Sequence, residues 1–155
     1  MFQHRTIAAL LLLSAFCSNL QAEQIIITDL SDFEFGAVAP SAGMLVLKKD
    51  ICVALDSPAR YSVLARGTGP ADQFTLSNGF NQLSYTVYFS DRPNQAGAQL
   101  SAGIPQPNLR GKKWKRGQVC RRATASIEVR VAASELAAAG AGQYSGLLIL
   151  TVTAD

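Results

Sequence analysis

The sequence lacks most of the groups that catalysis and metal binding use. Its 155 residues include a single histidine, His4, which falls in a stretch that we expect to be removed on export. The mature chain then has no imidazole to act as a base or a metal ligand. No glycine-rich phosphate loop occurs. Asp29, Asp32 and Glu34 lie close together in the sequence, and one interpretation is that two of them form a catalytic acid pair. We interpret them instead as the solvated face of an edge strand. We therefore predict that the chain is not an enzyme and needs no cofactor.

Long apolar runs are missing beyond the N-terminus. Residues 1–22 begin with "MFQHR", continue through the apolar "TIAALLLLSAF" and end in "LQA". This pattern is typical of a secretory signal peptide, with cleavage after Ala22. No later run is long enough for a membrane helix. We therefore expect one exported domain over residues 23–155, in the periplasm or at the cell surface, with no transmembrane segment.

Cysteine is scarce in the mature chain. Of the three cysteines, Cys17 leaves with the signal peptide, so Cys52 and Cys120 remain. In an exported protein an isolated pair of cysteines is more typical of a disulfide than of a metal or redox site. We predict that Cys52 and Cys120 are bonded, which stabilises the fold by about 4 kcal/mol in the chain-entropy model.

The sequence does contain short strand-like runs, separated by Gly, Pro, Asn and Asp. Tyr61, Val63 and Ala65 alternate with more polar residues, as strands with one buried face do. The runs cover residues 24–30, 33–38, 44–55, 60–66, 73–77, 83–91, 125–133 and 144–154. Seven or eight such runs predict an all-β antiparallel sandwich or barrel. Residues 133–142 resemble a single helical turn capped by Ser134, and residues 92–122 form a long excursion without a strand pattern.

A basic run stands out in a mature chain that is otherwise nearly balanced in charge. Residues 110–122, "RGKKWKRGQVCRR", place Trp114 among lysines and arginines. One interpretation is a contact with an anionic surface, and the plainer one is a solvated loop. No nucleic-acid-binding fold signature accompanies the run, so we expect no nucleic acid partner. The candidate contact residues are Arg110, Lys112, Lys113, Trp114, Lys115 and Arg116.

The C-terminal "AGQYSGLLILTVTAD", residues 141–155, is the most regular strand pattern. Tyr144, Leu148, Leu150 and Val152 share one parity, while Thr151 and other polar residues lie between them. A strand with nothing beside it leaves one row of backbone N–H and C=O groups unpaired. The sequence therefore raises the question of what pairs with this strand.

Taken in order, these runs resemble the small subunits of chaperone–usher pili, particularly archaic-type subunits and spore coat protein U-like domains. The resemblance is carried by "FEFGAV", "DICVALDSPARYSVLARGTG", "LSYTVYFSD" and "GQYSGLLILTVTAD". In that family a strand with Cys is followed by a strand with Tyr that ends at Gly, as Cys52, Tyr61 and Gly67 are placed here. The family's last strand opens with Gly-x-Tyr, which matches Gly142 and Tyr144.

The resemblance implies an immunoglobulin-like sandwich that lacks its last strand. Family subunits accept a strand first from a periplasmic chaperone and then from a neighbouring subunit, and an outer-membrane usher takes part in their assembly. Tyr144, Leu148, Leu150 and Val152 would then line the acceptor groove of this chain. Only "EQIIITDLSD" precedes "FEFG" in the mature chain, which is shorter than the family's donor segments. That difference implies a terminal position in the fibre, at its tip.

A second function remains open on the residues alone. The chain would then be a self-contained secreted sandwich whose basic loop, residues 110–122, binds an anionic surface. That alternative requires the C-terminal strand to pair within its own chain, and "QIIITDL" is the candidate partner.

Overall fold

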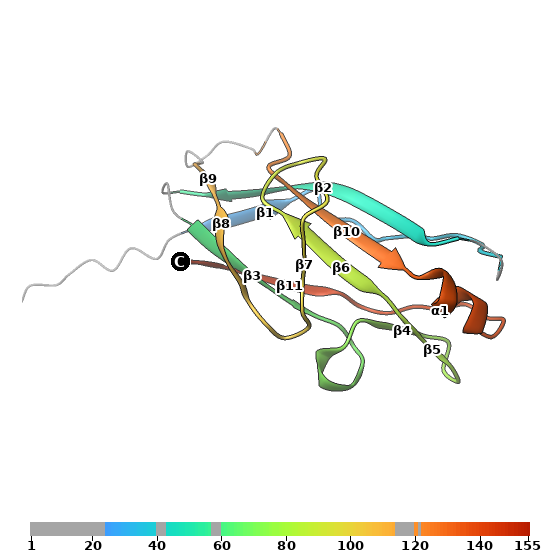
Figure 1. Ribbon diagram of the computed structural model, residues 1–155. Coiled ribbons are helices and arrows are strands. Elements are labelled where there is room, and N and C mark those ends of the chain that lie inside the picture. The colour runs from blue at the N-terminus through green and yellow to red at the C-terminus, as the bar shows by residue number, and fades with distance from the viewer. Residues whose placement is uncertain (1–23, 40–42, 57–59, 114–119, 121) are drawn as a thin grey trace, which may run out of the picture.

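The computed structural model describes residues 24–39, 43–56, 60–113, 120 and 122–155. Its strands form two layers that face each other across a hydrophobic core (Figure 1). The predicted signal peptide, residues 1–22, lies outside the described residues. No helix in the described part has both the length and the apolar character needed to cross a membrane.

The larger sheet has the order β1–β2–β10–β6–β7, and its neighbouring strands are antiparallel. Its strands are β1 (Ile25–Thr28), β2 (Leu45–Leu55), β10 (Ala125–Val131), β6 (Thr86–Ser90) and β7 (Ala98–Gln99). A short strand, β9 (Lys112–Lys113), lies parallel to the end of β2.

The smaller sheet has the antiparallel order β11–β3–β8. Its strands are β11 (Ile149–Ala154), β3 (Arg60–Arg66) and β8 (Gln106–Arg110). Beside it lie an antiparallel ribbon of β4 (Thr75–Ser77) and β5 (Gln82–Ser84), the turn η1 (Pro70–Asp72) and the helix α1 (Ala133–Ala138). The predicted all-β, immunoglobulin-like antiparallel sandwich is confirmed.

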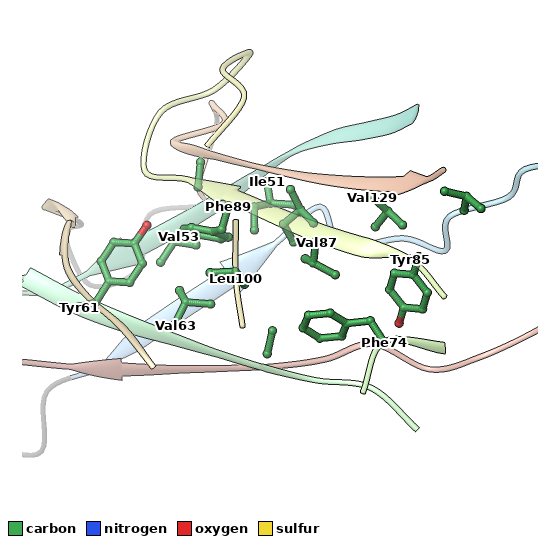
Figure 2. Close-up of a cluster of buried hydrophobic side chains, with 14 of the residues drawn as sticks. Ile51, Val53, Tyr61, Val63, Phe74, Tyr85, Val87, Phe89, Leu100 and Val129 are labelled. Atoms are coloured by element: carbon green, nitrogen blue, oxygen red, sulfur yellow. The ribbon is translucent and has the colours of Figure 1, made fainter. Parts of the chain in front are cut away.

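The core forms where alternating apolar residues of the two sheets meet (Figure 2). Tyr61 and Val63 of β3 and Val87 and Phe89 of β6 are almost completely buried. The Tyr61 and Phe89 rings pack edge to face with their centroids 6.3 Å apart. Burial, together with the nearby charge of Asp91, raises the pKa of Tyr61, so its phenol stays neutral.

The structure corrects the prediction of a strand over residues 33–38. These residues form no strand. The strand β1 ends at Thr28, and the chain turns at Asp29 before it reaches them. Asp29 has φ of 66°, in the left-handed region, which a continuing strand cannot accommodate. The segment that follows keeps an alternating sequence but lacks a hydrogen-bonded neighbour among the described residues.

The excursion over residues 92–122 was wrongly expected to lack strands, since β7, β8 and β9 all fall within it. These strands are two to five residues long, and residues 106–110 read "QPNLR", without an apolar alternation. Their backbone groups pair with the edges of longer strands: β7 with β6, β8 with β3 and β9 with β2. Such strands are set by tertiary pairing rather than by their own sequence pattern.

Several element boundaries also differ from those predicted, most clearly at three places. Residues 83–91 divide into β5 and β6 at Tyr85, and the C-terminal strand begins at Ile149 rather than at Tyr144. The helix stops at Ala138 instead of reaching residue 142. Ser134 does not cap it, because the N-cap position is Ala132 and no side chain caps the helix.

A disulfide joins Cys52, on β2, to Cys120. Their Cα atoms are 6.3 Å apart, within the range that a disulfide spans. Cys52 is fully buried in the middle of the larger sheet, opposite Thr28 of β1. The bond therefore ties Cys120, near the end of the basic run, to the larger sheet.

We predict that Cys52→Ser and Cys120→Ser lower the yield of folded protein equally, because each variant leaves the same bond unmade. The loss of stability should be about 2–5 kcal/mol. Denaturant unfolding of both variants tests the prediction, alongside mass spectrometry of the unreduced protein after alkylation. Alkylated cysteines in the unreduced parent protein would contradict it.

The outer face of β10 carries a buried ion-pair cluster around Glu128. Glu128 is only 4% exposed, and its carboxylate accepts hydrogen bonds from Arg130 and from Lys48, whose Nζ lies 3.2 Å away. The Arg130 guanidinium also lies 4.1 Å from the centre of the Tyr88 ring. Burial by itself would raise the pKa of Glu128, but the two cations outweigh it and lower the pKa below its ordinary value of 4.5.

We predict that Glu128→Gln lowers the free energy of unfolding at pH 7 by about 1–2 kcal/mol, less than for a fully buried pair because both cations are partly hydrated. A lowered native pKa stabilises the fold above the ordinary value of 4.5, and the effect disappears as pH falls through the native pKa. Urea unfolding at pH 7 and at low pH should show the difference between parent and variant shrinking. The exposed Glu34→Gln serves as control, and a difference that is independent of pH would contradict the assignment.

Candidate functional site: an apolar groove between two sheet edges

An apolar groove of about 1010 Å³ opens where the edges of the two sheets diverge. A buried water occupies about 30 Å³, and native cores have few voids larger than one water molecule. The groove is therefore far too large to be a packing defect. It is lined by residues 30–39, Leu45, Leu76, Leu83, Tyr85, Ile127, Val129, Val131, Leu136, residues 139–148 and Leu150.

The floor of the groove is the inner face of the larger sheet. Val129 and Val131 of β10 stand there, opposite Leu47 and Leu45 of β2 in the antiparallel register. One side is formed by residues 30–39, which we call the wall segment, and the other by residues 144–148, which lead into β11. Figure 1 shows both segments running toward the end of the sandwich that carries α1.

The strand β11 is the edge strand of its sheet at this groove. It pairs with β3, with Leu150 opposite Ala65 and Val152 opposite Val63. In the part of the chain that the structure describes, no strand pairs with its other edge. The segment "QIIITDL" forms β1, which pairs with β2 rather than with β11. The pairing that a self-contained sandwich requires is therefore not made in this structure.

Three of the four predicted groove residues line the groove, namely Tyr144, Leu148 and Leu150. Val152 lies on the same partly buried face of β11 but is not among the lining residues. Sequence reasoning missed the wall segment and the floor. The alternation of Phe33 and Phe35 with exposed neighbours is a usable signal that one face of the wall segment is apolar. The same alternation also fits an ordinary strand, which is what the sequence alone predicts for these residues.

The loop before β11 closes one end of the groove against the β4–β5 ribbon. The backbone groups of Ser145 and Ser77 exchange hydrogen bonds of 2.8 and 3.0 Å, and the Tyr144 hydroxyl donates to the Gly140 carbonyl at 3.0 Å. Tyr85 lines the same end, and burial raises its pKa, so that its hydroxyl stays protonated. These bonds hold Tyr144 in place at the groove's mouth.

The candidate anionic-surface contact is only partly described. Arg110 ends β8, where its backbone N–H donates to the Asp91 carboxylate, and Lys112 and Lys113 form the exposed β9. Trp114, Lys115 and Arg116 lie outside the described residues. Among the residues that are described, no three His, Cys, Asp or Glu side chains gather where they could hold one metal ion.

We predict that Gly146→Ala destabilises the protein by about 1–3 kcal/mol, because overpacking forces the backbone to shift. A Cβ at this position would lie 2.6 Å from the Thr75 carbonyl oxygen and push the groove loop off β4. Gly43→Ala is the matched control, since a Cβ there meets nothing within 4 Å. Urea unfolding of both variants tests the prediction, and equal stabilities would show that the loop does not depend on this close approach.

No protein-family model and no curated protein matches the chain. Among solved structures, the chain is similar to one chain of a chaperone–tip adhesin complex described as vital for activation of CFA/I fimbriae biogenesis. The TM-score is 0.51 at 13% identity, over 86% of this chain and 42% of that chain. The chain thus spans less than half the length of its neighbour. At this identity the likeness concerns the fold alone, and it agrees with the immunoglobulin-like sandwich described above.

Proposed function

We propose that this chain is a structural subunit of a surface fimbria, assembled by the chaperone–usher route. Its groove accepts an extended strand, first from a periplasmic chaperone and then from a neighbouring subunit, with an outer-membrane usher as the site of assembly. The chain is exported to the periplasm and then displayed at the cell surface. The observation that carries this proposal is the edge of β11, which borders an apolar groove and pairs with no described strand.

Backbone geometry supports a strand as the occupant. The edge of β11 presents a row of N–H and C=O groups, which an added strand satisfies by the same ladder that β3 makes on the other side. Leu148 and Leu150 alternate with exposed Leu147, Ile149 and Thr151, so an added strand places every second side chain over the groove. This spacing selects an alternating apolar sequence.

The energy of burial supports the same occupant. Fully burying one Leu side chain stabilises a protein by roughly 1.5–3 kcal/mol, and the groove exposes parts of several apolar residues. Without an occupant, this surface and the open edge favour aggregation. A chaperone that covers both during export would solve that problem until the next subunit arrives.

Two finer parts of the proposal rest on fewer residues. A terminal, tip position is supported by β1, whose residues pair with β2 and are therefore not free to extend into another subunit. Membership of the archaic-type, spore coat protein U-like branch rests on the spacing of Cys52, Tyr61 and Gly67 and on the Gly142–Tyr144 opening of the last segment.

We predict that the chain expressed alone in the periplasm is recovered poorly, and that a soluble one-to-one complex forms with its cognate chaperone. Leu150→Asp should abolish the complex, because an unpaired carboxylate would stand where an apolar donor residue docks. Thr151→Asp is the matched control on the exposed face of the same strand and should be milder. Co-purification followed by light scattering provides the measurement.

Amide hydrogen exchange decides between an open and a closed edge. In the chain alone, the amides that face away from β3 along residues 147–153 should exchange quickly, and chaperone should protect them. A stable soluble monomer in which all of these amides exchange slowly would mean that the sandwich is already closed. The proposed function would then be wrong.

A further inference from the structure

We propose that Lys49 is a positioning residue that holds the empty groove open by pinning the wall segment to β2. As a statement about strand acceptance it rests on the proposed function, whereas the pinning itself can be tested without any partner.

Lys49 is a charged residue at a core-facing position of β2. Residues of its parity in β2 face the core, and its neighbour in that row, Ile51, is 2% exposed. Directly opposite Lys49 in the antiparallel register is Ile127, which is 1% exposed and lines the groove. Directly opposite residues of an antiparallel pair project to the same side. A lysine here therefore interrupts an apolar row beside the groove floor, and such breaks of pattern mark functional positions.

The side chain of Lys49 extends to the wall segment, where its ammonium group finds hydrogen-bond acceptors. Its Nζ donates a 2.6 Å hydrogen bond to Ser31 Oγ and a second bond to the Asp32 carbonyl oxygen. The same Nζ lies 5.3 Å from the centre of the Phe33 ring. Three consecutive residues of the wall segment are thus held by one side chain.

The wall segment needs such an anchor because it has no ladder. The left-handed Asp29 separates it from β1, and no described strand pairs with it. Phe33, Phe35 and Val38 nevertheless turn their side chains toward the core cluster. The hydrophobic effect favours drawing this segment across the groove, where these side chains would cover the half-buried Leu148 and Leu150 on the opposite side. The bonds to Lys49 keep the segment on the β2 side of the groove.

This arrangement predicts what the loss of the ammonium does. In Lys49→Met the apolar row is restored, so the free energy of unfolding should stay equal or rise. The released wall segment should collapse into the groove and compete with an entering strand. Preorganisation of a site raises affinity by lowering the cost of ordering it, and Lys49 would preorganise the groove in this sense.

The experiment uses the whole mature chain with its disulfide intact and two probes. The first is the dye ANS, which binds exposed apolar surface. The second is a fluorescent peptide about ten residues long in which valine alternates with threonine, as strand addition requires. We expect Lys49→Met to bind less ANS and to bind the peptide about tenfold more weakly, mainly through slower association, because hydrogen bonds to a charged group are lost.

Three variants make the result specific. Lys49→Arg keeps the charge and the donors and should restore both readings, whereas Ser31→Ala removes one acceptor and should give an intermediate effect. Lys112→Met removes a positive charge from β9, outside the groove lining, and should change neither reading.

Each outcome decides one of the two proposals. In one outcome the parent protein binds neither the peptide nor a chaperone strand, while Lys49→Met binds less ANS than the parent. The proposed function is then wrong, and the pinning by Lys49 is supported. Unchanged or increased ANS binding in Lys49→Met overturns the pinning. If Lys49→Met instead differs from the parent only by associating with itself more strongly, Lys49 serves to protect the edge of β2 from pairing with other chains, as inward-pointing charges do. The inference is then wrong.

Discussion

Backbone groups at a sheet edge need hydrogen-bond partners, and along one edge of this structure no strand of the described residues supplies them. The edge of β11 borders the groove, while its other side is fully paired with β3. At one end the two sheets are brought together, because β1 and β11 approach each other there. At the other end the wall segment and residues 144–148 stay apart, and a groove lies between them above the inner face of β10. The sandwich is thus closely packed along most of its length and opens into a groove at one side.

The stabilising features are concentrated away from the groove. The disulfide of Cys52, the edge-to-face packing of Tyr61 on Phe89 and the ion pairs of Glu128 all belong to elements that are complete without any partner. These interactions hold β2, β3, β6 and β10 in register, so the groove is presented by a rigid frame. A site that receives a strand gains from such a frame, because fewer groups have to be ordered on binding.

Two residues that break the local pattern shape the open side. Asp29 ends β1 by adopting a left-handed conformation, and Lys49 places an ammonium group in a core-facing row. Each is unfavourable if its own strand is considered alone. Asp29 turns the chain out of β1, and Lys49 then holds residues 30–39 on the β2 side, which leaves the groove between two defined sides.

The sequence by itself determined the strands whose side chains alternate between core and solvent. In β3, β6 and β10 the residues that the period of two selects for the core, such as Val63, Phe89 and Val129, are buried. Tertiary structure decided the rest, because pairing partners are not encoded locally. Residues 33–38 alternate as a strand does, but no strand of the described residues pairs with them, whereas the polar β8 is a strand because β3 offers it an edge. The groove also depends on three segments distant in sequence, so the parity of Leu148 and Leu150 indicated one side of it while the wall and floor emerged only when the chain was folded.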